Sequence, residues 1–61
     1  MENTAKILIC DENDTERARL IENLYKAGVK RCDEAKDGVV AIEMIKNNTY
    51  DAVIIDLFRL S

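Results

Sequence analysis

The segment Lys6-Ile7-Leu8-Ile9-Cys10-Asp11-Glu12-Asn13 decides the fold of this chain. Its apolar residues form a continuous run and do not alternate with polar ones. This pattern is typical of a strand covered on both faces, as in a parallel sheet. A similar run, Ala52-Val53-Ile54-Ile55, also ends in an acid, Asp56. Both runs therefore predict buried strands, at residues 5–10 and 51–56.

Two helices are predicted between these strands. Asn13 is a good N-cap residue, and Glu16, three positions later, completes a capping box. The first helix is expected to end at Gly28, a favourable C-cap residue. Asp37-Gly38 is the start signal of the second helix. The predicted helices cover residues 14–27 and 38–47.

The segment between the helices, residues 30–35, alternates polar and apolar side chains, which favours a short edge strand. Helical connections between successive strands require a parallel sheet with right-handed crossovers. Because the first and third strands are apolar and the second is polar, the first strand is expected in the centre. The sequence therefore predicts a single α/β domain over residues 1–61. Its three-stranded parallel sheet has the order 2-1-3, with a helix on each face.

The composition limits the classes of function. The 61 residues carry 9 basic and 12 acidic side chains, a net charge of -3, which argues against a nucleic-acid-binding surface. The apolar runs of about five residues are far shorter than the roughly 20 that a membrane span needs. The first residues lack the features of a signal peptide. We therefore expect a cytoplasmic protein with no nucleic-acid or membrane partner, and no disulfide between Cys10 and Cys32.

Three acidic residues follow the two apolar strands: Asp11 and Glu12 after the first, and Asp56 after the other. The carboxyl ends of parallel strands lie side by side, and open α/β sheets place their ligands at this edge. Converging carboxylates repel one another unless a hard cation neutralises them, and oxygen ligands suit Mg²⁺. A carboxylate beside Mg²⁺ can act as a nucleophile toward a phosphoryl group. The alternative is that these acids only cap a helix or begin a turn.

Three segments together resemble the first half of a response-regulator receiver domain of bacterial two-component signalling. They are Lys6–Asn13, Ala35–Gly38 followed by Ala41-Ile42, and Tyr50–Leu57. The resemblance implies half of a flavodoxin-like fold, with Asp56 as the phosphoacceptor. It also implies Mg²⁺ as a cofactor, bound by Asp11, Glu12, Asp56 and the backbone carbonyl of Phe58. The implied reaction is phosphoryl transfer from a phosphohistidine of a histidine kinase or phosphotransfer protein to a chain that is not itself an enzyme.

The sequence departs from the receiver pattern in two respects. The sheet of a receiver domain has two further strands and the order 2-1-3-4-5. These two strands normally supply a Ser or Thr and a Lys to the phosphoryl site. The residues after Asp56, Leu57–Ser61, also differ from the usual sequence of the family at this point. The phosphotransfer expected of these 61 residues alone is therefore weak or absent.

The strand at 51–56 would form an unprotected edge in such a half-domain, and the helix at 38–47 is apolar on nearly every side. These features predict a homodimer, with edge pairing and domain swapping as alternative geometries. The expected interface residues are Val39, Val40, Met44, Val53 and Ile55. A second hypothesis is a truncated or engineered fragment that self-associates without biochemical activity. A metal-dependent phosphohydrolase is disfavoured because Phe58 stands where that class needs a second aspartate.

Overall fold

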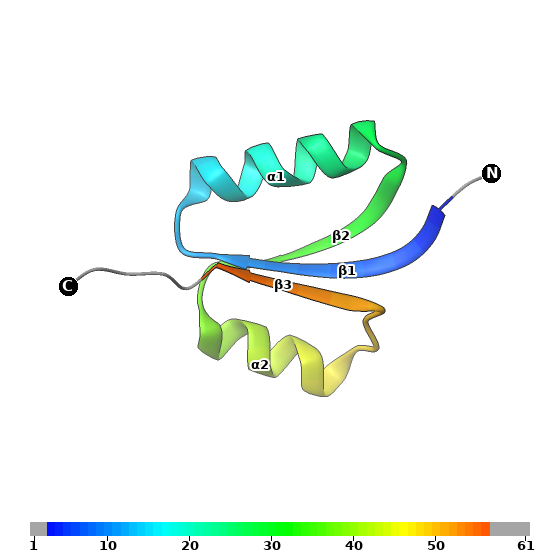
Figure 1. The fold of residues 1–61 in the computed structure, drawn as a ribbon. Coiled ribbons are helices and arrows are strands. Elements are labelled where there is room, and N and C mark those ends of the chain that lie inside the picture. Colours follow the sequence, from blue (N-terminus) through cyan, green and yellow to red (C-terminus); the bar gives the residue numbers. More distant parts are fainter. Residues whose placement is uncertain (1–2, 57–61) are drawn as a thin grey trace.

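A computed structural model describes residues 3–56, which form three strands and two helices in alternation (Figure 1). Each element lies within two residues of its predicted position. None of the helices that the structure describes is long and apolar enough to cross a membrane. The elements are β1 (Asn3–Asp11), α1 (Asp14–Lys26), β2 (Val29–Ala35), α2 (Gly38–Asn47) and β3 (Ala52–Asp56).

The three strands form one parallel sheet in the order β2-β1-β3. The register of β1 with β3 runs from Ile7, opposite Ala52, to Asp11, opposite Asp56. Figure 1 shows α1 on one face of the sheet and α2 on the other. The predicted α/β architecture, half of a flavodoxin-like unit, is therefore confirmed. β1 occupies the centre because its continuous apolar run can be buried on both faces.

The core lies on both faces of β1. Leu8, Ile9 and Cys10 are fully buried, and successive residues of a strand point to opposite faces. Leu8 and Cys10 pack with Ala35 and Ala41 on the side covered by α2, so Ile9 faces α1. Three partly buried residues complete the cluster beside α2: Val40, Met44 and Tyr50.

The helix ends follow local signals in the sequence. The Asp37 side chain caps α2 by accepting a hydrogen bond from the Val40 backbone N–H at 2.9 Å. α1 ends at Lys26, one residue earlier than predicted, because Ala27 is the C-cap residue. Gly28 follows it with φ +97°, a left-handed conformation that glycine adopts without the steric cost of a side chain.

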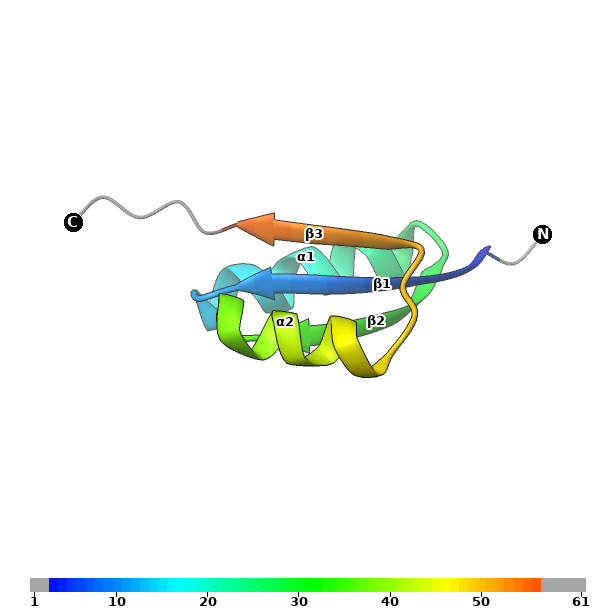
Figure 2. The same ribbon diagram turned by 90° about the horizontal axis from the view of Figure 1, so that it is seen from below.

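β3 is the least covered strand of the described chain. Both helices pack against β1 and β2, and no Cα atom of either helix lies within 8 Å of a Cα atom of β3. Figure 2 shows β3 beside β1, beyond the edge of α2. Val53 and Ile55 are consequently 38% and 52% exposed. Among residues 3–56, the outer edge of β3 also has no paired strand.

The residues of α2 that the sequence assigned to an interface divide into two groups. Val39 is exposed, but Val40 and Met44 are partly buried against the core of their own chain. Ile42 and Ile45 are exposed in their place. The apolar surface that α2 offers to solvent therefore differs from the expected one, because the helix turns Val40 and Met44 toward the sheet.

Tyr50 links the segment before β3 to β2. Its hydroxyl donates a hydrogen bond to the Asp33 carboxylate at 2.6 Å. This bond is the main reason that the pKa of Tyr50 rises to about 12, with smaller contributions from desolvation and from the Asp33 charge. The neutral phenol is therefore the form that the fold stabilises.

We expect the Tyr50 phenol to titrate near pH 12, and Asp33→Asn to lower the midpoint toward the ordinary value of about 10. Absorbance titration of a Tyr25→Phe protein, in which Tyr50 is the remaining tyrosine, measures both midpoints. Because the folded pKa exceeds the unfolded one, the stabilisation is complete below the unfolded pKa and is lost as the pH rises through the folded pKa. A midpoint that Asp33→Asn leaves unchanged would contradict this explanation.

Candidate metal centre at the carboxyl edge of the sheet

Asp11 and Asp56 end the two apolar strands and are register partners in the parallel pair. Register partners in adjacent strands point to the same face of a sheet, so the two side chains lie on the same side. Asp11 is only 6% exposed, whereas Asp56 is exposed. The structure thus brings together these two acids as the sequence predicted.

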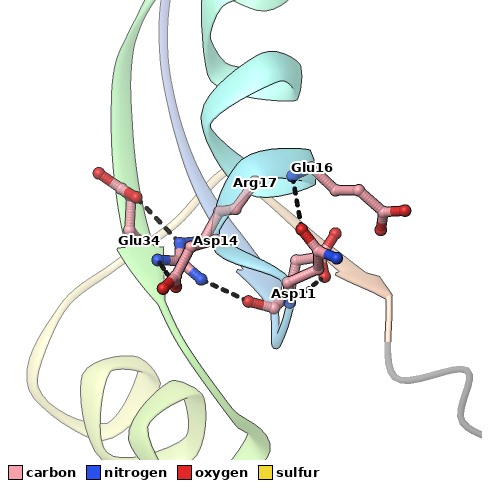
Figure 3. Close-up of polar contacts among 6 residues, drawn as sticks. Asp11, Asp14, Glu16, Arg17 and Glu34 are labelled. Carbon is pink, nitrogen blue, oxygen red and sulfur yellow. Dashed lines mark hydrogen bonds and ion pairs between the residues drawn. The ribbon is translucent and has the colours of Figure 1, made fainter.

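The turn from β1 into α1 positions a third acid. Asp11 Oδ1 accepts a hydrogen bond from the Asn13 backbone N–H at 2.8 Å. Asn13 Oδ1 in turn accepts one from the Glu16 backbone N–H at 2.9 Å (Figure 3). The predicted N-cap is therefore confirmed, but Asp11 takes the Asn13 N–H that a capping box assigns to Glu16. The Glu16 carboxylate consequently does not serve the helix cap.

Asp11, Glu16 and Asp56 form what we call the carboxylate cluster. Each contributes one carboxylate oxygen, and these oxygens lie within 4.8 Å of one another. An octahedral Mg²⁺ has metal–oxygen distances of about 2.0–2.1 Å, so its ligand oxygens are about 3–4 Å apart. Carboxylate oxygens together with water are also the ligands that Mg²⁺ prefers. The cluster therefore has the chemistry of a hard-cation site. Its spread of up to 4.8 Å is wider than the separation of ligands on one ion, so the three oxygens would have to move closer together to bind the same cation.

The two other predicted ligands have different outcomes. Glu12 is exposed and lies outside the carboxylate cluster, and Phe58 lies outside the described residues. Sequence reasoning missed Glu16 because its spacing from Asn13 matches a capping box. The sequence did contain a signal that Glu16 need not close the cap. Asp11, two residues before Asn13, can accept the same backbone N–H.

An open depression of about 300 Å³ adjoins the carboxylate cluster. A water molecule in the liquid occupies about 30 Å³, so this space is sufficient for a hydrated cation and a phosphate-sized anion. Arg19 contributes a positive charge to its lining. The lining residues are Asp11, Glu16, Arg19, Leu20, Asn23 and Asp56.

The Cys10 thiol, on the α2 face of the sheet, is poorly suited to nucleophilic chemistry. Burial raises the pKa of Cys10, and the negative charges of Asp37, Glu12 and Asp11 raise it further, against an opposing effect of Arg17. The thiol therefore stays protonated at neutral pH and packs as a small apolar group. Both cysteines of the chain are free, Cys10 in the core and Cys32 half-buried on β2.

The site as a whole consists of carboxylates from β1, α1 and β3, with the exposed Asp56 accessible to an incoming group. Such an arrangement can bind a divalent cation and present one carboxylate oxygen as a nucleophile. In comparisons with known proteins, no family model, no curated protein and no solved structure matches this chain.

Proposed function

We propose that this chain is a cytoplasmic phosphoacceptor module in which Asp56 accepts a phosphoryl group beside a divalent cation. The observation that carries this proposal is the convergence of Asp11, Glu16 and Asp56 within 4.8 Å at the carboxyl edge of the sheet. The resemblance to receiver domains supports the same assignment.

The three carboxylates are suited to different roles. Asp11 is buried and its Oδ1 is held by the Asn13 N–H, so its orientation is fixed. Glu16 stands on the first turn of α1, and Asp56 is exposed at the end of β3. Bound Mg²⁺ would offset the charge of the approaching phosphoryl oxygens. Asp56 is therefore the member of the cluster that a phosphodonor can approach.

The proposed reaction is a phosphoryl transfer with no change of oxidation state. An Asp56 carboxylate oxygen attacks the phosphorus of a phosphohistidine on a histidine kinase or phosphotransfer protein. The new O–P bond forms an acyl phosphate, while the N–P bond of the donor breaks. The imidazole leaves with the electron pair and takes up a proton. Arg19, in the lining of the adjoining depression, provides positive charge for the phosphoryl oxygens.

The proposal predicts Mg²⁺-dependent uptake of one phosphoryl group from phosphoramidate or acetyl phosphate, measured by intact-protein mass spectrometry. Chelation of the metal should abolish uptake. Glu16→Gln should weaken Mn²⁺ binding by about tenfold, equivalent to about 1.4 kcal/mol, because it removes one charged ligand. Glu12→Gln is the matched control outside the carboxylate cluster and should have a smaller effect. Equal losses in both variants would argue against Glu16 as a ligand.

A second candidate function is self-association through β3. The outer edge of β3 has no strand among residues 3–56, and the backbones of both helices lie more than 8 Å from β3 at every Cα pair. An exposed edge with apolar side chains is a template for pairing with another chain. A second copy offers the same unpaired edge, and twofold closure is the commonest symmetry of oligomers.

The sequence of β3 is compatible with antiparallel pairing to a second copy. A register centred on Ile54 sets Val53 opposite the partner's Ile55. It also sets Asp56 opposite the partner's Ala52, so no two like charges stand directly opposite one another within the strand. The resulting sheet would have the order 2-1-3-3-1-2 and would cover an edge that is open in the single chain. This proposal and the phosphoacceptor proposal are compatible.

A further inference from the structure

Arg17 joins three parts of the chain next to the carboxylate cluster. Its Nη1 donates a hydrogen bond to the Asp11 carbonyl oxygen at 2.6 Å. Nη2 donates to Asp14 Oδ1 at 2.7 Å, and Nε donates to Glu34 Oε1 at 2.9 Å (Figure 3). The side chain is only 13% exposed. One guanidinium therefore ties the end of β1 to the start of α1 and to β2.

The contact with Asp11 is made to its main chain and not to its carboxylate. The Asp11 carbonyl lies where β1 leaves the sheet and the turn into α1 begins. Within this turn, Asn13 is bonded to the Asp11 carboxylate and to the Glu16 backbone N–H. A shift of the turn would therefore move both Asp11 and Glu16 relative to Asp56 on the neighbouring strand.

The chemistry of Arg17 suits this bridging role. The hydrogen bonds that Arg17 donates to the Glu34 and Asp14 carboxylates raise the pKa of Arg17, so the group is permanently charged. Its planar guanidinium presents donors in fixed directions, which lets it bond a carbonyl and two carboxylates simultaneously. A lysine ammonium keeps the charge but is a point charge on a flexible stem, without this fixed fork.

We propose that Arg17 is the positioning residue of the carboxylate cluster, holding the β1–α1 turn so that Asp11 and Glu16 meet Asp56. This inference rests on the proposed metal-dependent function. Positioning and simple electrostatics have opposite consequences at this site. Removing a positive charge near a cation site strengthens cation binding, whereas loosening the turn weakens it.

The test compares Mn²⁺ affinity, measured by electron paramagnetic resonance, in the wild type and in Arg17→Lys and Arg17→Gln. Loss of a residue that orients metal ligands commonly lowers affinity by about 10–100-fold. We expect about a tenfold loss in Arg17→Lys and at least as large a loss in Arg17→Gln. The matched controls are Arg31→Lys and Arg31→Gln, because Arg31 also bonds a strand carbonyl, that of Thr4 at 3.1 Å. Circular dichroism establishes the temperature at which every variant is folded.

Amide hydrogen exchange provides a second readout in the absence of metal. In Arg17→Lys, the Asn13 and Glu16 amides should exchange faster, because the hydrogen bonds of the Arg17 guanidinium no longer hold the turn that contains them. Tighter Mn²⁺ binding in Arg17→Gln, with no change in Arg17→Lys, would overturn the positioning role and leave the phosphoacceptor proposal intact. Absence of Mn²⁺ binding in the wild type would instead overturn the proposed function and, with it, this inference.

Discussion

Asp56→Asn is expected to abolish phosphoryl uptake, because asparagine lacks the nucleophilic carboxylate that forms the acyl phosphate. The same substitution removes a charge from the carboxylate cluster and should weaken Mn²⁺ binding by about tenfold or more, equivalent to at least about 1.4 kcal/mol. The fold should be retained, since Asp56 is exposed at the end of β3 and contributes nothing to the apolar core. Intact-protein mass spectrometry after incubation with phosphoramidate and Mg²⁺ measures the first effect.

Asp51→Asn is the matched control for this substitution. Asp51 is an exposed aspartate just before β3, where its Oδ2 accepts a hydrogen bond from the Lys6 backbone N–H at 2.7 Å. An asparagine oxygen can keep that bond, so phosphoryl uptake should be unchanged. Label that persists in Asp56→Asn, or that maps to Asp11 or Glu16 in the wild type, would contradict the assignment of Asp56.

The fold follows closely from the sequence because strong local signals and global packing agree. The continuous apolar run of β1 can be buried only in the centre of the sheet, and Leu8, Ile9 and Cys10 are fully buried there. Asp37 begins α2 where a helix start signal stands in the sequence. The apolar run of β1 and the start signal of α2 each consist of residues near one another in the chain. Such local patterns are the information that a single sequence carries best.

The site was only partly predictable because its third member depends on a competition for one hydrogen bond. Both Asp11 and Glu16 could accept the Asn13 N–H, and spacing alone favoured Glu16 as half of a capping box. In the structure Asp11 accepts it, and Glu16 joins the carboxylate cluster. The register that sets Asp56 beside Asp11 was predictable, since both residues end apolar parallel strands.

The exposed apolar surface was harder to predict, since helical phase decides which side of α2 meets the sheet. The sequence shows that α2 is apolar on nearly every side, but not that Val40 and Met44 turn inward while Ile42 and Ile45 remain exposed. The exposure of the β3 side chains follows from the order of strands and helices in the fold. The helical connections lie over β1 and β2, and no Cα atom of either helix lies within 8 Å of a Cα atom of β3.

Ile55→Lys is expected to dissociate a homodimer formed through β3. Ile55 is 52% exposed in the single chain, so the fold can accept a lysine there. In the paired sheet the ammonium would lie among apolar side chains of the partner, where an unpaired charge is costly. Self-association should weaken by about 100-fold or more, which corresponds to about 2.7 kcal/mol. Sedimentation equilibrium over a range of protein concentrations measures the change.

Tyr25→Lys is the matched control, because Tyr25 is 58% exposed and lies on α1, away from β3. It introduces the same charge at a similarly exposed apolar position, and the dimer should persist. Mg²⁺ should tighten the association, since neutralising the carboxylate clusters reduces the repulsion between two acidic chains that meet along β3. A folded wild-type monomer at all concentrations would rule out edge pairing between copies. A dimer that withstands Ile55→Lys would place the interface elsewhere, on a surface that does not include the face of β3 carrying Val53 and Ile55.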